Sequence, residues 1–145
     1  MSQLGHADEF RDLVVYQKAM QAAMRVFEIT KSFPREEAYS LTSQIRRASR
    51  SVGAQIAEAW GKRRYEKHFV SKLTDADAER RETQHWVDAA RACGYLAQQD
   101  ASTLDNELAE IGRMLRGMMQ KADAFCGGDS SITRECAGEY LCTPE

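Results

Sequence analysis

Proline is nearly missing from this sequence of 145 residues, because it occurs only at Pro34 and Pro144. About 110 consecutive residues therefore lack the residue that most strongly breaks a helix. No segment shows the apolar and polar alternation of a β-strand. Apolar runs are short, and none approaches the ~18 residues that a membrane-spanning helix requires. These absences favour an all-α protein and argue against a membrane protein.

The sequence also lacks the motifs of the common enzyme and metal-binding classes. It has no glycine-rich phosphate loop and no Ser/His/Asp order. The cysteines form no C-x-x-C pair, which argues against a zinc site and favours free thiols; they are Cys93, Cys126, Cys136 and Cys142. A disulfide among the last three would require an oxidising compartment. The N-terminus lacks the layout of a signal peptide, so we expect a cytoplasmic protein. Because the enzyme and metal motifs are missing, we expect no catalytic activity and no cofactor.

One weak metal motif remains, the E-x-x-H spacing of Glu82 and His85. Di-iron helix bundles use such a pair, but they also need a second E-x-x-H and a glutamate from each of two further helices. The other histidines, His6 and His68, lack this spacing, and only Glu58 is a suitable extra carboxylate. We therefore expect Glu82 and His85 to be polar surface or interface residues, and we predict no metal site.

Four segments, in contrast, carry apolar residues at helical spacing. They span residues 12–31, 41–61, 66–94 and 103–125. The first ends before Pro34, because the residue preceding a proline is pushed away from α geometry. The predicted core stripes are Leu13, Tyr16, Met20, Met24 and Phe27; Leu41, Ile45, Ala48, Val52, Ile56 and Ala59; Phe69, Leu73, Ala76, Trp86, Ala90 and Cys93; and Leu104, Leu108, Ile111, Leu115, Met118, Ala122 and Phe125.

These four segments predict an antiparallel up-down four-helix bundle, because short connections make neighbouring helices antiparallel. Ser40 is a candidate N-cap for the second helix, and Ser102 with Asp105 resembles a capping box for the fourth. The middle of the third helix is polar and must face water, another subunit or a satisfied polar network. We expect the bundle to occupy residues 1–126 and residues 127–145 to form a flexible tail.

Charge is unevenly distributed, although the net charge is only −2. Residues 41–68 hold seven Lys and Arg against two Glu, whereas residues 100–145 hold nine acidic residues against four basic ones. Such segregation suits an anionic ligand or an assembly of complementary surfaces.

The basic excess falls in two groups. The first lies opposite the apolar stripe of its helix, and arginine forks match phosphate or carboxylate groups there. The second interleaves with Trp60 and Tyr65 in the following turn, as in nucleic-acid stacking sites. Alternatively, the first group is an ordinary solvated face, and in the second group the aromatic rings seal the bundle while the cations are solvated. The candidate nucleic-acid-binding residues are Arg46, Arg47 and Arg50 in the first group, and Lys62, Arg63, Arg64 and Lys67 in the second.

From about Phe10 to Leu115 the chain resembles the bacterial four-helix-bundle protein family, also called the 23S ribosomal-RNA intervening-sequence proteins. The resemblance rests on Phe10-Arg-Asp-Leu13 with Tyr16-Gln-Lys-Ala19, Thr30-Lys-Ser-Phe33-Pro34, Leu41-Thr-Ser-Gln-Ile-Arg-Arg-Ala48, Ile56-Ala-Glu58, Glu82-Thr83 with Trp86, and Gly94-Tyr-Leu96. It implies a cytosolic bundle with no established enzymatic activity, in a family where ring-shaped homopentamers are known. It also implies kinship with accessory proteins of diversity-generating retroelements, which bind nucleic acid and a reverse transcriptase.

Two functions follow as hypotheses. The first is a non-catalytic homopentameric scaffold that binds RNA or DNA through its basic face. The second is a protein-interaction module whose arginines contact acidic residues of another subunit or partner, without nucleic acid.

Overall fold

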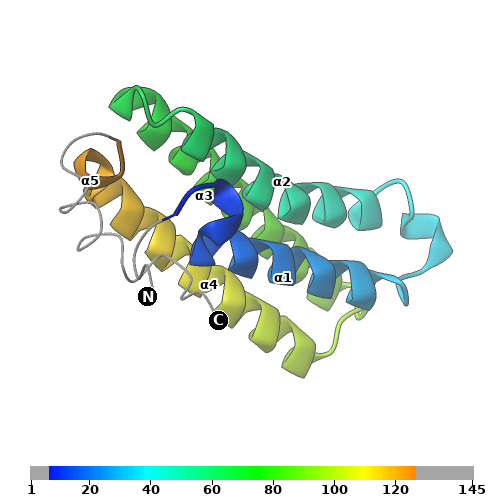
Figure 1. Ribbon diagram of the computed structural model, residues 1–145. Helices are drawn as coiled ribbons and strands as arrows, with labels where there is room; N and C mark the ends of the chain where they lie inside the picture. The colour runs from blue at the N-terminus through cyan, green and yellow to red at the C-terminus, as the bar shows by residue number, and fades with distance from the viewer. Residues whose placement is uncertain (1–6, 127–145) are drawn as a thin grey trace.

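The computed structural model describes residues 7–126, and within this range it is helical with no strand. Four long helices lie side by side and run alternately up and down (Figure 1): α1 (Val14–Thr30), α2 (Leu41–Gly61), α3 (Glu66–Ala92) and α4 (Gln98–Gln120). The remaining helices are short: η1 (Phe10–Asp12), η2 (Arg35–Glu37) and α5 (Ala122–Cys126). The predicted antiparallel four-helix bundle is confirmed. The predicted tail, 127–145, lies outside the described residues.

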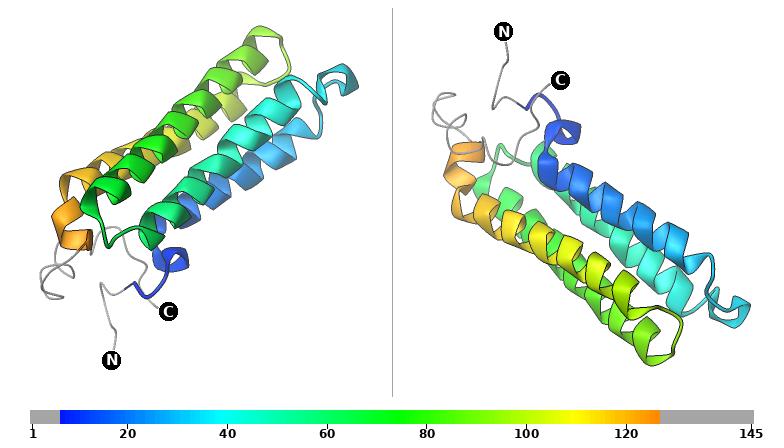
Figure 2. Two further views of the ribbon diagram at one scale, coloured as in Figure 1. Left: turned by 90° about the horizontal axis from the view of Figure 1, so that it is seen from above. Right: turned by 90° about the horizontal axis from the view of Figure 1, so that it is seen from below.

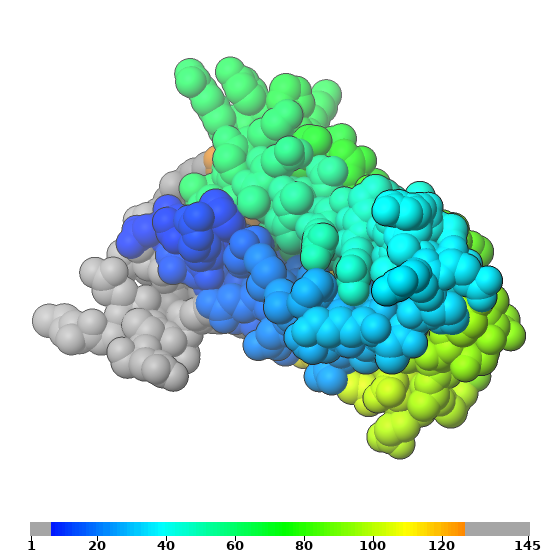
Figure 3. Space-filling view, turned by 90° about the vertical axis from the view of Figure 1, so that its right-hand side faces the viewer, coloured from blue at the N-terminus to red at the C-terminus, as the bar shows by residue number. Residues whose placement is uncertain are grey.

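Contacts between α1 and α2, α2 and α3, α3 and α4, and α4 and α1 close the bundle around one core, and the α2–α3 contact is the most extensive. Figure 2 shows the four long rods from two sides. The turn between α2 and α3 lies at the same end as η1 and α5. The opposite end carries η2 and the α3–α4 connection, and Figure 3 shows the molecule from this end, with the η2 region in cyan. We call these the turn end and the loop end.

Helix α2 has the predicted bounds and the predicted buried face. All six residues of its stripe, from Leu41 to Ala59, are buried. Ser40 occupies the N-cap position but makes no cap hydrogen bond, because its hydroxyl instead donates to Glu37. Burial of the apolar face therefore stabilises this helix more than its cap does.

Leu13, just before α1, is buried as predicted, but the helix itself buries a different face from the predicted one. The small residues Val15, Ala19, Ala22 and Val26 lie in the core. Met20 and Met24, predicted to be buried, are 45% and 50% exposed. The prediction for these two methionines is wrong because two stripes with helical spacing overlap in this segment. The stripe of small side chains allows the helices to approach closely, and it packs inward.

Helix α4 begins at Gln98, five residues before its predicted start. Ser102 therefore lies inside the helix, where its hydroxyl accepts a hydrogen bond from the Gln98 side chain, and the predicted capping box is wrong. Buried Ala101 extends the apolar stripe towards the N-terminus and explains the earlier start. The rest of the predicted stripe is buried as expected, although the helix is interrupted at Lys121 before α5.

The polar centre of α3 forms a satisfied network inside the bundle. Arg80 is 4% exposed, and its Nε donates to Oδ1 of Asp77 over 2.8 Å while Nη1 donates to Oε1 of Gln84 over 3.1 Å. Across the α3–α4 contact, its guanidinium lies against Gly112, where an added Cβ would come within 2.6 Å of Cζ. Near the C-terminal end of α3, Val87 is buried, whereas Cys93, which directly follows the helix, is exposed. The prediction that Cys93 belongs to the core is therefore wrong.

Candidate assembly and nucleic-acid-binding surfaces

Arg47 is paired with carboxylates of the same chain. Its Nη2 donates to both carboxylate oxygens of Glu82, over 2.6 and 2.7 Å, and Nη1 lies 3.5 Å from Glu79. The hydrogen bond from Arg47 holds the pKa of Glu82 below its ordinary value, whereas burial raises the pKa of Glu79. Both carboxylates come from α3. The sequence of α2 alone could not show them, because they lie more than 30 positions away.

Arg46 and Arg50 have no carboxylate within ion-pair distance among residues 7–126. Arg46 is half-buried, and its Nε donates to the Thr30 hydroxyl over 2.8 Å. The guanidinium carbons of Arg46 and Arg50 lie 4.9 and 5.8 Å from the ring centroid of Phe27. These two arginines therefore lie over an aromatic ring of α1, and no carboxylate among residues 7–126 neutralises their charge.

An apolar groove of about 270 Å³ runs between α1 and α2 beside these arginines. Tyr16 and Met20 of α1 face Gly53 and Ala57 of α2 across it, and Arg50 lines one side. Because glycine has no side chain and alanine has only a methyl group, the surface of α2 is recessed at these positions. We call this surface, with exposed Met24 and half-buried Phe27, the α1–α2 face.

A second hollow lies along the first half of α2, at about 530 Å³. Its lining includes Arg46, Arg47 and Arg50 together with Ser43 and Ser51. The first group of predicted arginines is thus brought together. Within it, Arg47 is neutralised by α3, whereas Arg46 and Arg50 are not.

In the α2–α3 turn, Trp60 and Arg63 form a closed unit. Trp60 is buried, and the Arg63 guanidinium carbon lies 3.4 Å from its ring centroid. Arg63 Nε also donates to the Trp60 carbonyl over 2.9 Å. Burial lowers the pKa of Arg63. Trp60 therefore seals the turn end of the bundle, and its ring is covered rather than open for stacking.

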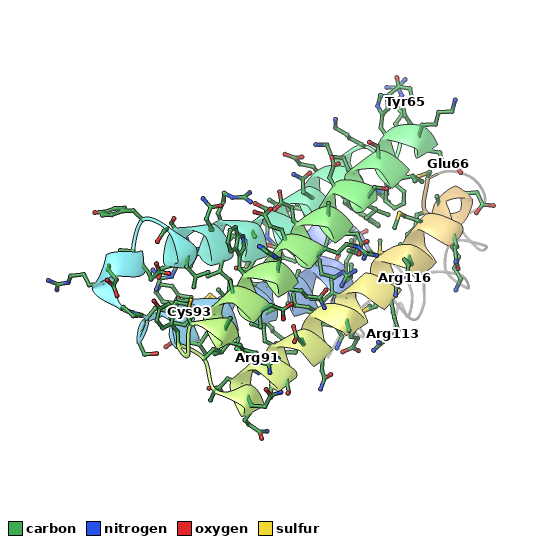
Figure 4. All side chains as sticks on the ribbon, turned by 180° about the vertical axis from the view of Figure 1, so that it is seen from behind. Tyr65, Glu66, Arg91, Cys93, Arg113 and Arg116 are labelled. Atoms are coloured by element: carbon green, nitrogen blue, oxygen red, sulfur yellow. The ribbon has the colours of Figure 1, made fainter. Side chains whose placement is uncertain are left out.

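The remaining cations of the turn project outward. Lys62, Arg64 and Lys67 are exposed and have no carboxylate within ion-pair distance in the described part of the chain. Tyr65 is 56% exposed and lies at the tip of the turn (Figure 4). Unlike Trp60, it does not seal the core. We call Lys62, Arg64, Tyr65 and Lys67 the basic turn.

The two predicted basic groups do not form one continuous patch. Arg50 and Lys62 are separated by about 18 Å along the axis of α2. The hollow holds the first group, whereas the second lies at the turn end. The assignment of all seven residues to nucleic-acid binding remains a prediction, and the structure divides them into sites with different neighbours.

Glu82 and His85 are not part of a metal-binding cluster among the residues that the structure describes. Both oxygens of Glu82 bind Arg47, and Oε1 also accepts a hydrogen bond from Trp86 Nε1. Across residues 7–126, no three side chains of His, Cys, Asp or Glu are grouped closely enough to hold a metal ion. In the same range, no helix combines the length and the apolar character of a membrane span.

Sequence reasoning missed the α1–α2 face because it placed Met20 and Met24 in the core. One signal could have located it. The stripe from Val15 to Val26 has the same helical spacing and consists of small residues, so it competes with the methionine stripe for the interior.

Comparisons with known proteins agree with this architecture. A solved structure from Bacteroides thetaiotaomicron, described as a protein with unknown function from the S23 ribosomal protein family, is 27% identical in sequence. The match covers 73% of this chain and 98% of that chain, with a TM-score of 0.67. No curated protein matches the chain. The model of the 23S rRNA-intervening sequence proteins matches residues 11–117, which confirms the resemblance, and the chain belongs to this family.

Proposed function

We propose that this protein is a non-catalytic cytoplasmic scaffold that assembles into a homo-oligomer and binds nucleic acid. The observation that carries the proposal is the separation of two kinds of surface on one bundle. The α1–α2 face combines exposed apolar side chains with arginine, and the basic turn at one end offers exposed cations. A ring of five subunits is the assembly that the family resemblance favours.

The composition of the α1–α2 face supports its role in assembly. Methionine, aromatic residues and arginine are enriched in protein interfaces, whereas lysine is depleted. Met20, Met24 and Phe27 provide the apolar contact, and Arg46 and Arg50 can pair with carboxylates of a second copy. This part of the proposal takes up the alternative hypothesis, in which the arginines make subunit contacts.

The basic turn supports the second half of the proposal. Within residues 7–126 its cations have no carboxylate partner, so contact with phosphate would not require breaking an ion pair in this part of the chain. Contacts of this kind release condensed counterions and make affinity depend steeply on salt. The basic turn lies about 18 Å from Arg50 along α2, so both surfaces can be occupied in one subunit.

Assembly is tested by native mass spectrometry of the full chain and of a Met20→Glu, Met24→Glu variant. The wild type should be oligomeric, and the variant should be monomeric and folded, because two carboxylates cannot be buried unpaired in an apolar contact. The double variant Gln99→Glu, Asn106→Glu, on exposed positions of α4, adds the same number of carboxylates as a control and should remain oligomeric. A monomeric wild type, or a variant that forms the same oligomer as the wild type, would remove the α1–α2 face from the proposal.

Nucleic-acid binding is tested by fluorescence anisotropy with labelled RNA and DNA at 50 mM salt. Replacing Lys62, Arg64 and Lys67 with glutamine should weaken binding at least about tenfold and reduce the salt dependence. Replacing Arg113 and Arg116 of α4, which lie away from the turn in Figure 4, should have a smaller effect. Equal losses in both variants would indicate nonspecific attraction, and the absence of binding by the wild type would contradict this half of the proposal.

A further inference from the structure

We infer that the basic turn selects single-stranded nucleic acid, with one unpaired base stacked on the ring of Tyr65 and the neighbouring cations on the phosphates. This inference rests on the nucleic-acid binding proposed above and specifies the class of ligand. It depends on the position of one aromatic side chain that the fold does not use.

Tyr65 is not needed to complete the core. The turn end is already filled by Trp60 beneath Arg63, and by Phe69 against Phe125, with ring centroids 5.9 Å apart. Tyr65 occupies the N-cap position of α3, where the backbone conformation matters and the side chain makes no cap hydrogen bond. Its exposed ring therefore lies outside the packed interior.

The surroundings of Tyr65 suit a stacked base. The ring of His68 lies 5.3 Å from the Tyr65 ring at an interplanar angle of 52°, and the Arg64 guanidinium carbon lies 5.8 Å from the Tyr65 centroid. The Arg64 guanidinium lies over part of the ring, but Tyr65 is still 56% exposed, so planar and cationic groups accompany an accessible π surface. Aromatic rings interleaved with positive charge are the elements by which proteins bind single strands without reading the sequence.

This arrangement discriminates against duplexes. In a duplex, each base covers the faces of its neighbours, so Tyr65 could reach only the backbone or a base edge. In a single strand, an unstacked base can place its face against the tyrosine ring while the adjacent phosphates contact Lys62 and Lys67. Duplex binding would use the cations alone, which makes the contribution of Tyr65 specific to single strands.

Glu66 is the one carboxylate within residues 62–68. It lies in the first turn of α3, where its negative charge interacts favourably with the positive end of the helix dipole and stabilises the helix. The same charge repels phosphate near Tyr65. Glu66→Gln should therefore strengthen the binding of single strands and duplexes alike, which separates the electrostatic contribution from stacking.

The experiment compares the full-length wild type and a Tyr65→Ala variant by anisotropy, using a 12-nucleotide oligo-U and an RNA duplex of 12 base pairs. The variant should bind oligo-U about tenfold more weakly and bind the duplex with unchanged affinity. Its salt dependence should also be unchanged, because no charge is lost. Tyr65→Phe should retain the affinity of the wild type.

Tyr39→Ala is the matched control, because Tyr39 is 97% exposed and precedes the other end of α2. It should leave both affinities unchanged. In a second measurement, an oligonucleotide carrying 5-iodouridine should form a photo-crosslink that maps to Tyr65. Equal loss of single-strand and duplex binding in Tyr65→Ala, or crosslinks that map only elsewhere, would overturn the inference while leaving nucleic-acid binding in place. If the wild type binds neither nucleic acid, the proposed binding function fails as well.

Discussion

Arg80 illustrates at the scale of one residue why a charge inside a bundle need not destabilise it. Its guanidinium is buried, but Asp77 and Gln84 on the same helix accept its hydrogen bonds. Gly112 on α4 leaves the space that the guanidinium occupies. The sequence showed a polar centre in α3 and left three environments open. It could not choose among them because the deciding residue belongs to another helix.

Gly112→Ala should destabilise the bundle by about 1–3 kcal/mol, because overpacking costs more than the ~1 kcal/mol that alanine adds to helix propensity. The added Cβ would lie 2.6 Å from the guanidinium, which Asp77 and Gln84 hold in place. Urea unfolding gives the difference in the free energy of unfolding. Gly61→Ala, where nothing lies within 4 Å of the new Cβ, is the control and should be neutral or stabilising by up to about 1 kcal/mol. A Gly112→Ala protein as stable as the wild type would mean that Arg80 can move away freely.

At the scale of a helix, α3 shows how charged residues that are close in sequence create pH dependence. Burial opposes ionisation of Asp77, but the hydrogen bonds and charges of Arg80 and Arg81 outweigh it and lower the pKa of Asp77. A carboxyl group whose pKa is lower in the folded state stabilises the protein above its unfolded-state pKa. This stabilisation is lost as the pH falls through the lowered folded-state pKa.

Asp77→Asn should therefore cost about 3 kcal/mol at pH 7, because it leaves the buried Arg80 charge without its carboxylate. The difference between wild type and variant should shrink as the pH is lowered from 7 towards 3, because the unfolded chain takes up a proton on this carboxyl group there while the folded protein, whose Asp77 pKa is lowered, resists doing so. Urea unfolding at both pH values measures it. Asp75→Asn, on an exposed position 3.8 Å from Lys72, should change stability by less than about 0.5 kcal/mol. A difference that is constant with pH would contradict the assigned ion pair.

The helices differ in how well their buried faces could be predicted, for a physical reason. In α2 and α4 there is one apolar stripe, and no second stripe could occupy the interior in its place. The buried faces of both helices were therefore predicted correctly, apart from the start of α4. In α1, large and small stripes overlap, and periodicity cannot rank them. The neighbouring helix decides, because Ala19 and Ala22 allow a closer approach than Met20 and Met24 would.

At the scale of the whole molecule, the fold was predictable because apolar periodicity and short connections are local properties. The functional surfaces were only partly predictable, since they depend on pairing between distant segments. Arg47 is paired with Glu82 of α3, and Arg63 is half-buried against Trp60. The other five candidate cations have no carboxylate partner among residues 7–126. In an oligomer, several basic turns would act together, so modest affinity at each could give tight binding overall.

The shortness of the α2–α3 connection also bears on how the chain folds. The two helices with the most extensive mutual contact are separated by only residues 62–65. Closing so short a loop costs little chain entropy, and contacts between sequence neighbours form fastest. We therefore expect this hairpin to form early and to template the docking of α1 and α4. The basic turn, to which we assign ligand recognition, would then also connect the two helices that form the folding nucleus.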